Sequence, residues 1–123
     1  MIIGIGIDIV EIERIKKALD KEAFRDKVFS TYEIEYCESK KTNKFASYAV
    51  RFAAKEAFVK ALGTGFRKGN LTDIYVENDA LGKPFMTLSG PYVEIAKDKQ
   101  IKHIHLSLSH STQTAVAQVI LEG

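Results

Sequence analysis

The stretch RFAAKEAFVKALGTG, residues 51–65, decides the fold. Its side chains are mostly small or apolar, with charged residues at helical spacing among them, which is typical of a packed helix. Asn43 precedes this helical segment as a candidate cap, and Gly63 and Gly65 follow it, as glycines do just beyond a helix end. We therefore predict a long central helix over residues 44–62.

The chain before this helix predicts a strand and two short helices. Residues 2–9 carry isoleucines punctuated by Gly4 and Gly6, which predicts a buried strand whose backbone is closely approached. Apolar residues at helical spacing predict a short helix over residues 11–18. Asp8 is therefore expected at the end of a strand just before a helix, where ligands often bind. Ser30 followed by Glu33 is a capping-box pattern, which predicts a second helix through Cys37.

The chain after the long helix changes to a strand pattern. Residues 74–76 and 85–88 predict a hairpin around the turn Leu81-Gly82-Lys83-Pro84. A short helix is expected at about residues 91–99, followed by strands at 104–109 and 115–121. The order of elements predicts one α+β domain over residues 1–123, with a mainly antiparallel sheet and a long central helix.

Bulk composition excludes several classes of protein. The 123 residues are 46% hydrophobic and 28% charged, which is ordinary for a globular domain. The single cysteine, Cys37, cannot form an internal disulfide. The N-terminal residues lack a basic segment and contain Asp8, so no secretory signal is predicted. No apolar run approaches the about 20 residues that span a bilayer, and we expect a cytoplasmic protein without membrane contact.

Two carboxylates stand out as candidate metal ligands. Asp8 lies among β-branched residues, where it is either a helix cap or a cation ligand. Glu56 and Lys60 are four residues apart on the long helix, where they form either a local ion pair or part of a functional site. Mg²⁺ is commonly bound by one or two carboxylates together with substrate phosphates and water. Asp8 and Glu56 would suffice for such a site.

Other motifs exclude familiar hydrolases. Residues 105–110 offer imidazoles and hydroxyls, but their spacing is not that of the zinc motif H-E-x-x-H, and the chain has no G-x-S-x-G nucleophile elbow. Residues 63–69 are glycine-rich and basic, but they follow a helix and lack the ending of a P-loop. A plain loop at the helix end is the favoured interpretation, with contact to a phosphate as the alternative.

Taken together, the segments resemble holo-acyl carrier protein synthase, the small bacterial type of 4′-phosphopantetheinyl transferase. The resemblance is carried by residues 4–15, residues 51–65, the Gly82-Lys83-Pro84 turn, residues 105–110 and residues 115–117. The order and spacing of these stretches match the family over nearly the whole chain. One mild departure is Ser30, where the family often has threonine, which supplies the same capping oxygen.

The resemblance implies an enzyme that transfers the 4′-phosphopantetheine group of coenzyme A to a serine of apo-acyl carrier protein and releases adenosine 3′,5′-bisphosphate. It implies a role in fatty acid biosynthesis and a requirement for Mg²⁺. Asp8 and Glu56 match the metal ligands, and Lys60 matches a catalytic position near the diphosphate. The base that takes the serine proton is either Glu56 or a water on the metal.

The resemblance also implies further contacts and an assembly. Arg14 matches a position that meets the acidic recognition helix of the carrier protein. Small bacterial members are homotrimers with each active site between two subunits. The positions that match the coenzyme A site, besides Lys60, are Arg51, Gly63, Lys83, Pro84, His105 and Ser107.

Two other functions compete with this interpretation. The net charge is only +2, but basic residues are in excess in residues 1–70, which would suit a nucleic-acid-binding module. No basic patch with interleaved aromatic residues accompanies that excess, so we expect no nucleic acid partner. The second alternative is an interaction domain that has kept the fold and lost catalysis. Loss of Asp8 or Glu56 would indicate it, and both are present.

Overall fold

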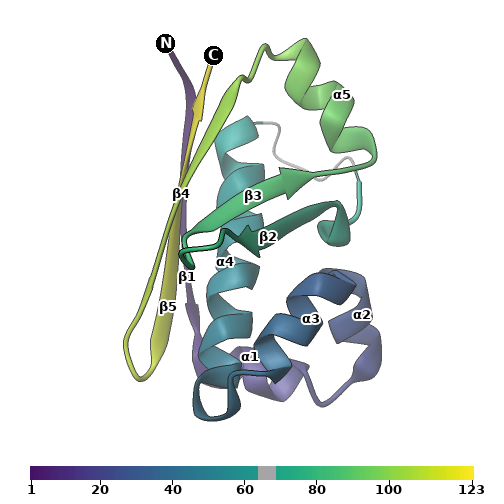
Figure 1. Ribbon diagram of the computed structural model, residues 1–123, viewed down its shortest axis with the longest axis vertical. Coiled ribbons are helices and arrows are strands. Elements are labelled where there is room, and N and C mark those ends of the chain that lie inside the picture. The colour runs from purple at the N-terminus through teal and green to yellow at the C-terminus, as the bar shows by residue number, and fades with distance from the viewer. Residues whose placement is uncertain (64–68) are drawn as a thin grey trace.

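The computed structural model describes residues 1–63 and 69–123 and has the α+β architecture that the sequence predicts. A sheet covers one side of the long helix α4, and the hairpin and the other helices pack around the rest of it (Figure 1). The strands are β1 (Ile2–Glu11), β2 (Ile74–Asn78), β3 (Pro84–Leu88), β4 (His103–His110) and β5 (Thr114–Glu122). The helices are α1 (Ile12–Ala18), α2 (Glu22–Val28), α3 (Thr31–Glu38), α4 (Lys44–Leu62) and α5 (Pro91–Asp98), with short 3₁₀ turns η1 (Lys41–Asn43) and η2 (Leu71–Asp73).

All strand pairs that the structure describes are antiparallel. The larger sheet has the order β1-β5-β4, and β2 and β3 form a separate hairpin. In the larger sheet Asp8 lies opposite Ala117, and Ala117 lies opposite Leu108. Because residues directly opposite one another share a face, these three side chains are on the same side of the sheet.

The two glycines of β1 allow α4 to approach the strand closely. A Cβ atom built on Gly4 would lie 2.0 Å from the carbonyl oxygen of Ala61, and one on Gly6 would lie 2.0 Å from that of Ala57. Any side chain at either position would therefore separate the strand from the helix. The close approach that the sequence predicts for this backbone is confirmed.

The prediction that β1 is a buried strand is wrong for one of its faces. The isoleucines alternate with the glycines, so they point away from α4, and Ile5, Ile7 and Ile9 are 60%, 58% and 68% exposed. The helix covers only the glycine face, because that face alone has room for its backbone. Asp8 also lies inside β1 and not at its end, since the strand continues to Glu11.

The helix ends are mostly those that the sequence predicts. Ser30 and Glu33 form the capping box of α3, with the Glu33 amide donating to Ser30 Oγ at 3.2 Å and the Ser30 amide to Glu33 Oε1 at 2.9 Å. Gly63 ends α4 in the left-handed region at φ 72°. Asn43 occupies the N-cap position of α4 as predicted, but it also ends η1 and its side chain makes no capping bond.

Helix α2 is absent from the sequence-based prediction. It has only seven residues, and Val28 is its one buried side chain. Tertiary packing holds it, because the half-buried ring of Phe24 lies 6.1 Å from that of Phe52 on α4 and 6.2 Å from that of Phe29.

The buried apolar side chains of the described residues form one cluster around α4. It includes Val10, Ile15, Phe29, Tyr48, Ala53, Ala57, Phe58, Ile74, Val76, Tyr92, Ala117, Val119 and Leu121. None of the helices in residues 1–63 and 69–123 has the length and apolar character needed to cross a membrane.

Candidate active site

Lys60 joins α4 to the middle of β1. Its Nζ donates to Asp8 Oδ1 at 3.0 Å and to the carbonyl oxygen of Ile7 at 3.0 Å. The Asp8 side chain is 17% exposed and that of Lys60 is 56% exposed. The carboxylate of Asp8 is therefore mostly covered, whereas the side chain of Lys60 that contacts it is largely open to solvent.

Glu56 lies on the same side of α4, one turn before Lys60, and is half-buried. Gly4 contacts Ala61 and Gly6 contacts Ala57, so the helix runs opposite to the strand. One turn back along α4 therefore corresponds to a step forward along β1, toward Asp8. We call Asp8, Glu56 and Lys60 the β1–α4 site.

The donor set of this site fits a divalent cation that takes most of its ligands from elsewhere. Asp8 already binds a positive charge, the ammonium group of Lys60. No group of three or more His, Cys, Asp or Glu side chains able to hold a metal occurs among the residues that the structure describes. Two carboxylates completed by substrate oxygens and water are the usual arrangement for Mg²⁺.

Arg51 is almost fully buried, with 3% of its surface exposed. Its guanidinium donates to the Ser47 carbonyl oxygen and to Asn78 Oδ1, both at 3.1 Å, and its Cζ lies 4.3 Å from the centre of the Tyr36 ring. Arg51 therefore braces the end of β2 against α4. Its predicted contact with coenzyme A stays a prediction.

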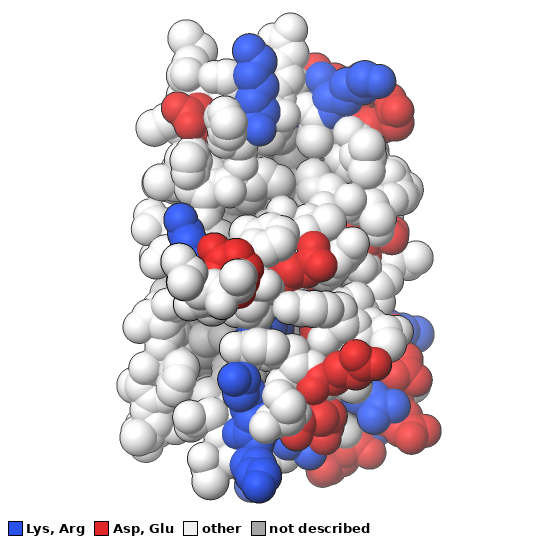
Figure 2. Space-filling view, viewed as in Figure 1, with Lys and Arg blue, Asp and Glu red and all other residues white. Residues whose placement is uncertain are grey.

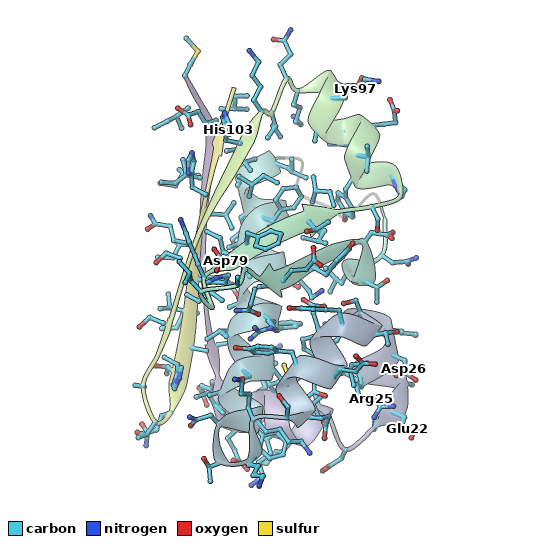
Figure 3. All side chains as sticks on the ribbon, viewed as in Figure 1. Glu22, Arg25, Asp26, Asp79, Lys97 and His103 are labelled. Carbon is cyan, nitrogen blue, oxygen red and sulfur yellow. The ribbon has the colours of Figure 1, made fainter. Side chains whose placement is uncertain are left out.

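The turn that carries Lys83 and Pro84 is held by its own side chains. Asp79 Oδ1 accepts from the amides of Leu81 and Lys83, both at 2.9 Å, and Gly82 has φ 89°. Figure 3 labels Asp79 at this tip of the hairpin. Lys83 is exposed at the turn. The ammonium group of Lys83 and the ring of Pro84 therefore extend from a turn whose backbone is fixed by hydrogen bonds.

His105 and Ser107 lie on the opposite face of the larger sheet from Asp8. Ser107 lies opposite Gln118, and both are exposed on the face that α4 does not cover. His105 Nε2 is 2.8 Å from Glu122 Oε1, and this hydrogen bond lowers the pKa of Glu122. The structure therefore does not bring His105 and Ser107 to the β1–α4 site within one chain.

The remaining predicted residues lie at opposite ends of α4. Arg14 is exposed on α1. Charged side chains of both signs gather in the lower part of the face shown in Figure 2, where α2 and α3 lie. Gly63 ends α4. The glycine-rich loop considered as a phosphate contact falls largely on residues 64–68, which lie outside the described residues.

Lys55 and Glu33 form a buried ion pair that sequence reasoning missed. Both side chains are 0% exposed, and Lys55 Nζ lies 2.7 Å from Glu33 Oε1. Lys55 also donates to the carbonyl oxygens of Leu71 and Ile74, at 3.0 and 2.5 Å, and Glu33 Oε2 accepts from the Val76 amide at 2.9 Å. Burial lowers the pKa of Lys55, and Glu33 opposes that shift.

This pair connects the capping box of α3 to η2 and β2. A lysine within an otherwise apolar part of α4 was the available sequence signal, because a buried cation requires a partner. Its partner could not be identified from spacing, since the two residues are 22 apart in the chain. Together with Arg51, the pair sets where the β2–β3 hairpin lies relative to α4.

Comparisons with known proteins agree with this fold over its full length. The family model of the 4′-phosphopantetheinyl transferase superfamily matches residues 4–119. A holo-[acyl-carrier-protein] synthase of Treponema denticola is 50% identical over 123 residues, covering 100% of both chains. The crystal structure of holo-[acyl-carrier-protein] synthase from Neisseria meningitidis has a TM-score of 0.90 at 35% identity, covering 100% of both chains. That of Helicobacter pylori in complex with coenzyme A has a TM-score of 0.83 at 36% identity, covering 96% of this chain and 99% of that chain.

The matched region includes β1 and α4, the two elements that carry Asp8, Glu56 and Lys60. Similarity therefore extends through both the sequence and the fold that build the β1–α4 site. On this evidence the chain belongs to the 4′-phosphopantetheinyl transferase superfamily, among the holo-[acyl-carrier-protein] synthases.

Proposed function

We propose that this chain transfers the 4′-phosphopantetheine group of coenzyme A to a serine of apo-acyl carrier protein, giving the holo-carrier and adenosine 3′,5′-bisphosphate. The observation that carries the proposal is the ion pair by which Lys60 on α4 meets Asp8 on β1, with Glu56 one turn before Lys60 on the same helix. Two carboxylates and a lysine suit chemistry at a diphosphate. The coenzyme A complex of the Helicobacter pylori relative supports the same substrate here.

In the proposed reaction the carrier serine Oγ forms a bond to the phosphorus that bears the pantetheine arm. The bond from that phosphorus to the leaving adenosine bisphosphate oxygen breaks. Mg²⁺ held by Asp8 and Glu56 would neutralise the charge that develops on the diphosphate oxygens. Lys60, one turn after Glu56 on α4, would stabilise or protonate the departing oxygen. Glu56 or a water molecule accepts the serine proton.

We propose that the enzyme is a homotrimer with each active site between two subunits. His105 and Ser107 lie on the uncovered face of the sheet, and Asp8 faces α4, so one chain cannot present all of them to one coenzyme. The uncovered face also exposes Ile5, Ile7 and Ile9, an apolar stripe suited to a protein partner. Packing that face against the β1–α4 site of a neighbour would unite the two halves.

The carrier protein is proposed to dock on α1 through Arg14. Arg14, Lys16 and Lys17 are exposed there and suit an acidic helix. We expect Arg14→Glu to raise the KM for the carrier protein by about tenfold and to leave the KM for coenzyme A unchanged. Steady-state kinetics with each substrate varied would check this, and an unchanged KM for the carrier would remove Arg14 from the interface.

We place the activity in the cytoplasm, in fatty acid biosynthesis.

The decisive experiment is mass spectrometry of an apo-carrier protein after incubation with this enzyme, coenzyme A and Mg²⁺, with and without EDTA. A metal-dependent gain equal to one phosphopantetheine group is expected. If the wild type gives no such gain, the proposed activity is wrong.

The metal ligands are tested in the same assay with Asp8→Ala and Glu56→Ala. Each is expected to lose transfer while retaining its circular dichroism spectrum. Glu94→Ala removes an exposed carboxylate from α5 and serves as a control with full activity. Transfer at the wild-type rate by either site variant would refute the metal assignment.

A further inference from the structure

The contact between Lys60 and Asp8 occupies one oxygen of the carboxylate that the proposed metal requires. Lys60 Nζ lies 3.0 Å from Asp8 Oδ1, which is hydrogen-bonding distance for a charged pair. A divalent ion bound to the same oxygen would lie close to the ammonium group. Because both are cations, the two cannot share that position without strong repulsion.

The two partners differ in their freedom to move. Asp8 lies inside β1, which pairs with β5 on one side and contacts α4 through Gly4 and Gly6. Its side chain is therefore held in place, with 17% exposed. Lys60 has a long stem that is 56% exposed and lies one turn of helix from the glycine that ends α4. When the two separate, Lys60 is the group that moves.

We propose that Lys60 is an internal counter-cation that holds Asp8 in the metal-free enzyme and leaves it when a divalent ion binds. This inference rests on the proposed metal site. The displaced ammonium group needs a new anionic partner, and the coenzyme diphosphate that is proposed to bind at the same site would supply one. Lys60 thus changes partner from Asp8 to the phosphate, where it has the catalytic role proposed above.

A thermodynamic consequence follows. Without coenzyme, the metal must displace Lys60 into solvent, so the affinity of the enzyme for the metal is reduced. With coenzyme bound, the displaced Lys60 pairs with the diphosphate, so displacing it no longer reduces the affinity for the metal. Metal and coenzyme therefore bind with positive coupling, and by linkage each raises the affinity for the other by the same factor. Lys60 is a source of that coupling.

The test measures Mn²⁺ binding, as the probe for the divalent site, by electron paramagnetic resonance of the free ion in the presence and absence of coenzyme A. Lys60→Met is expected to bind Mn²⁺ about fivefold more tightly than the wild type without coenzyme, because the competing cation is gone. The factor by which coenzyme A improves Mn²⁺ affinity is expected to shrink in this variant. Lys60→Arg keeps a cation at this position and is expected to retain weak binding and strong coupling.

A matched control separates this effect from a general loss of positive charge. Lys44→Met removes a lysine from an ion pair with Glu38, at 2.9 Å and far along α4 from the site. Its Mn²⁺ affinity is expected to equal that of the wild type. The inference is overturned if Lys60→Met binds Mn²⁺ no more tightly than wild type without coenzyme, or keeps the full coupling.

One further variant distinguishes failure of the exchange from failure of the metal site. Asp8→Asn is expected to abolish specific Mn²⁺ binding while the melting temperature shows a folded protein. If Asp8→Asn binds Mn²⁺ like the wild type, the metal site itself is wrong. If Asp8→Asn loses binding and Lys60→Met shows no gain, only the exchange is wrong.

Discussion

At the scale of the residue, burial decides whether a reactive group can react. Cys37 is 0% exposed on α3, and burial raises the pKa of its thiol to about 12. Only the thiolate is a good nucleophile, so at neutral pH this cysteine is both covered and protonated.

We therefore predict that native protein does not react with Ellman's reagent at pH 8 within an hour. After unfolding in guanidinium chloride, the expected result is stoichiometric release of the chromophore, because the thiol becomes exposed. Cys37→Ser provides the blank in both conditions. Rapid labelling of the native protein would contradict the buried position.

At the scale of the element, the seam between β1 and α4 depends on the absence of two side chains. In Gly6→Ala the new Cβ would lie 2.0 Å from the Ala57 carbonyl oxygen and 2.8 Å from the Ala61 amide nitrogen, so the backbone must shift. We expect a loss of about 3 kcal/mol or more in the free energy of unfolding, measured by urea denaturation.

The same shift would move Asp8 away from Lys60, so transfer activity is expected to fall in Gly6→Ala even where the protein stays folded. Glu94→Ala is the control, because Glu94 is exposed on α5, outside both elements of the seam. A variant at Gly6 with wild-type stability would show that the helix does not pack on this strand as described.

The buried pair of Lys55 and Glu33 holds the hairpin to the helices. Lys55→Met is expected to lower the free energy of unfolding by about 3–5 kcal/mol, because it leaves a buried carboxylate without its counter-charge. Adding Glu33→Gln removes that charge, and the double variant is expected to be destabilised by less than the sum of the single variants.

An exposed pair gives the matched comparison. Lys44 Nζ lies 2.9 Å from Glu38 Oε1, close to the 2.7 Å of the buried pair, but the two side chains are 33% and 42% exposed. Lys44→Met is expected to cost about 1 kcal/mol or less, because water screens both charges. Equal effects of Lys44→Met and Lys55→Met in urea denaturation would contradict the buried network.

At the scale of the whole molecule, the uncovered face of the sheet requires an explanation. Ile7 is 58% exposed between the similarly exposed Ile5 and Ile9, and such a stripe is costly in water. Ile7→Lys is expected to convert the proposed trimer to a monomer, as measured by sedimentation equilibrium. Val93→Lys places the same charge on an exposed apolar residue of α5 and is expected to leave the mass unchanged. A wild-type monomer would contradict the assembly, as would an unchanged Ile7→Lys trimer.

The bounds of α4 could be predicted from sequence because every signal for them is local. Its helical periodicity and the glycine at its end act within a few residues, and the predicted and observed ranges are both 44–62. The hairpin and the capping box of α3 were predictable for the same reason. Helix α2 was not, since its seven residues bury only Val28 within the helix and depend on the ring of Phe52.

The candidate site was predicted in part. Asp8, Glu56 and Lys60 were singled out from their residue types and the family resemblance, and the structure joins Lys60 to Asp8 across 52 residues of chain. The role of Lys55 was missed for two reasons. Its partner is distant in sequence, and a charged residue type gives no indication that the side chain is buried.

By itself, the sequence determined the order of strands and helices apart from α2, and the residue types available for chemistry, because backbone propensity and side-chain periodicity act over a few residues. Only the tertiary structure decided which face of β1 is covered. Alternation defines two faces, but the close contact of α4 with Gly4 and Gly6 selects one and leaves the isoleucines exposed. The same packing decided that Lys60 binds Asp8 and that Lys55 is buried, since both depend on where α4 lies against elements far away in the chain.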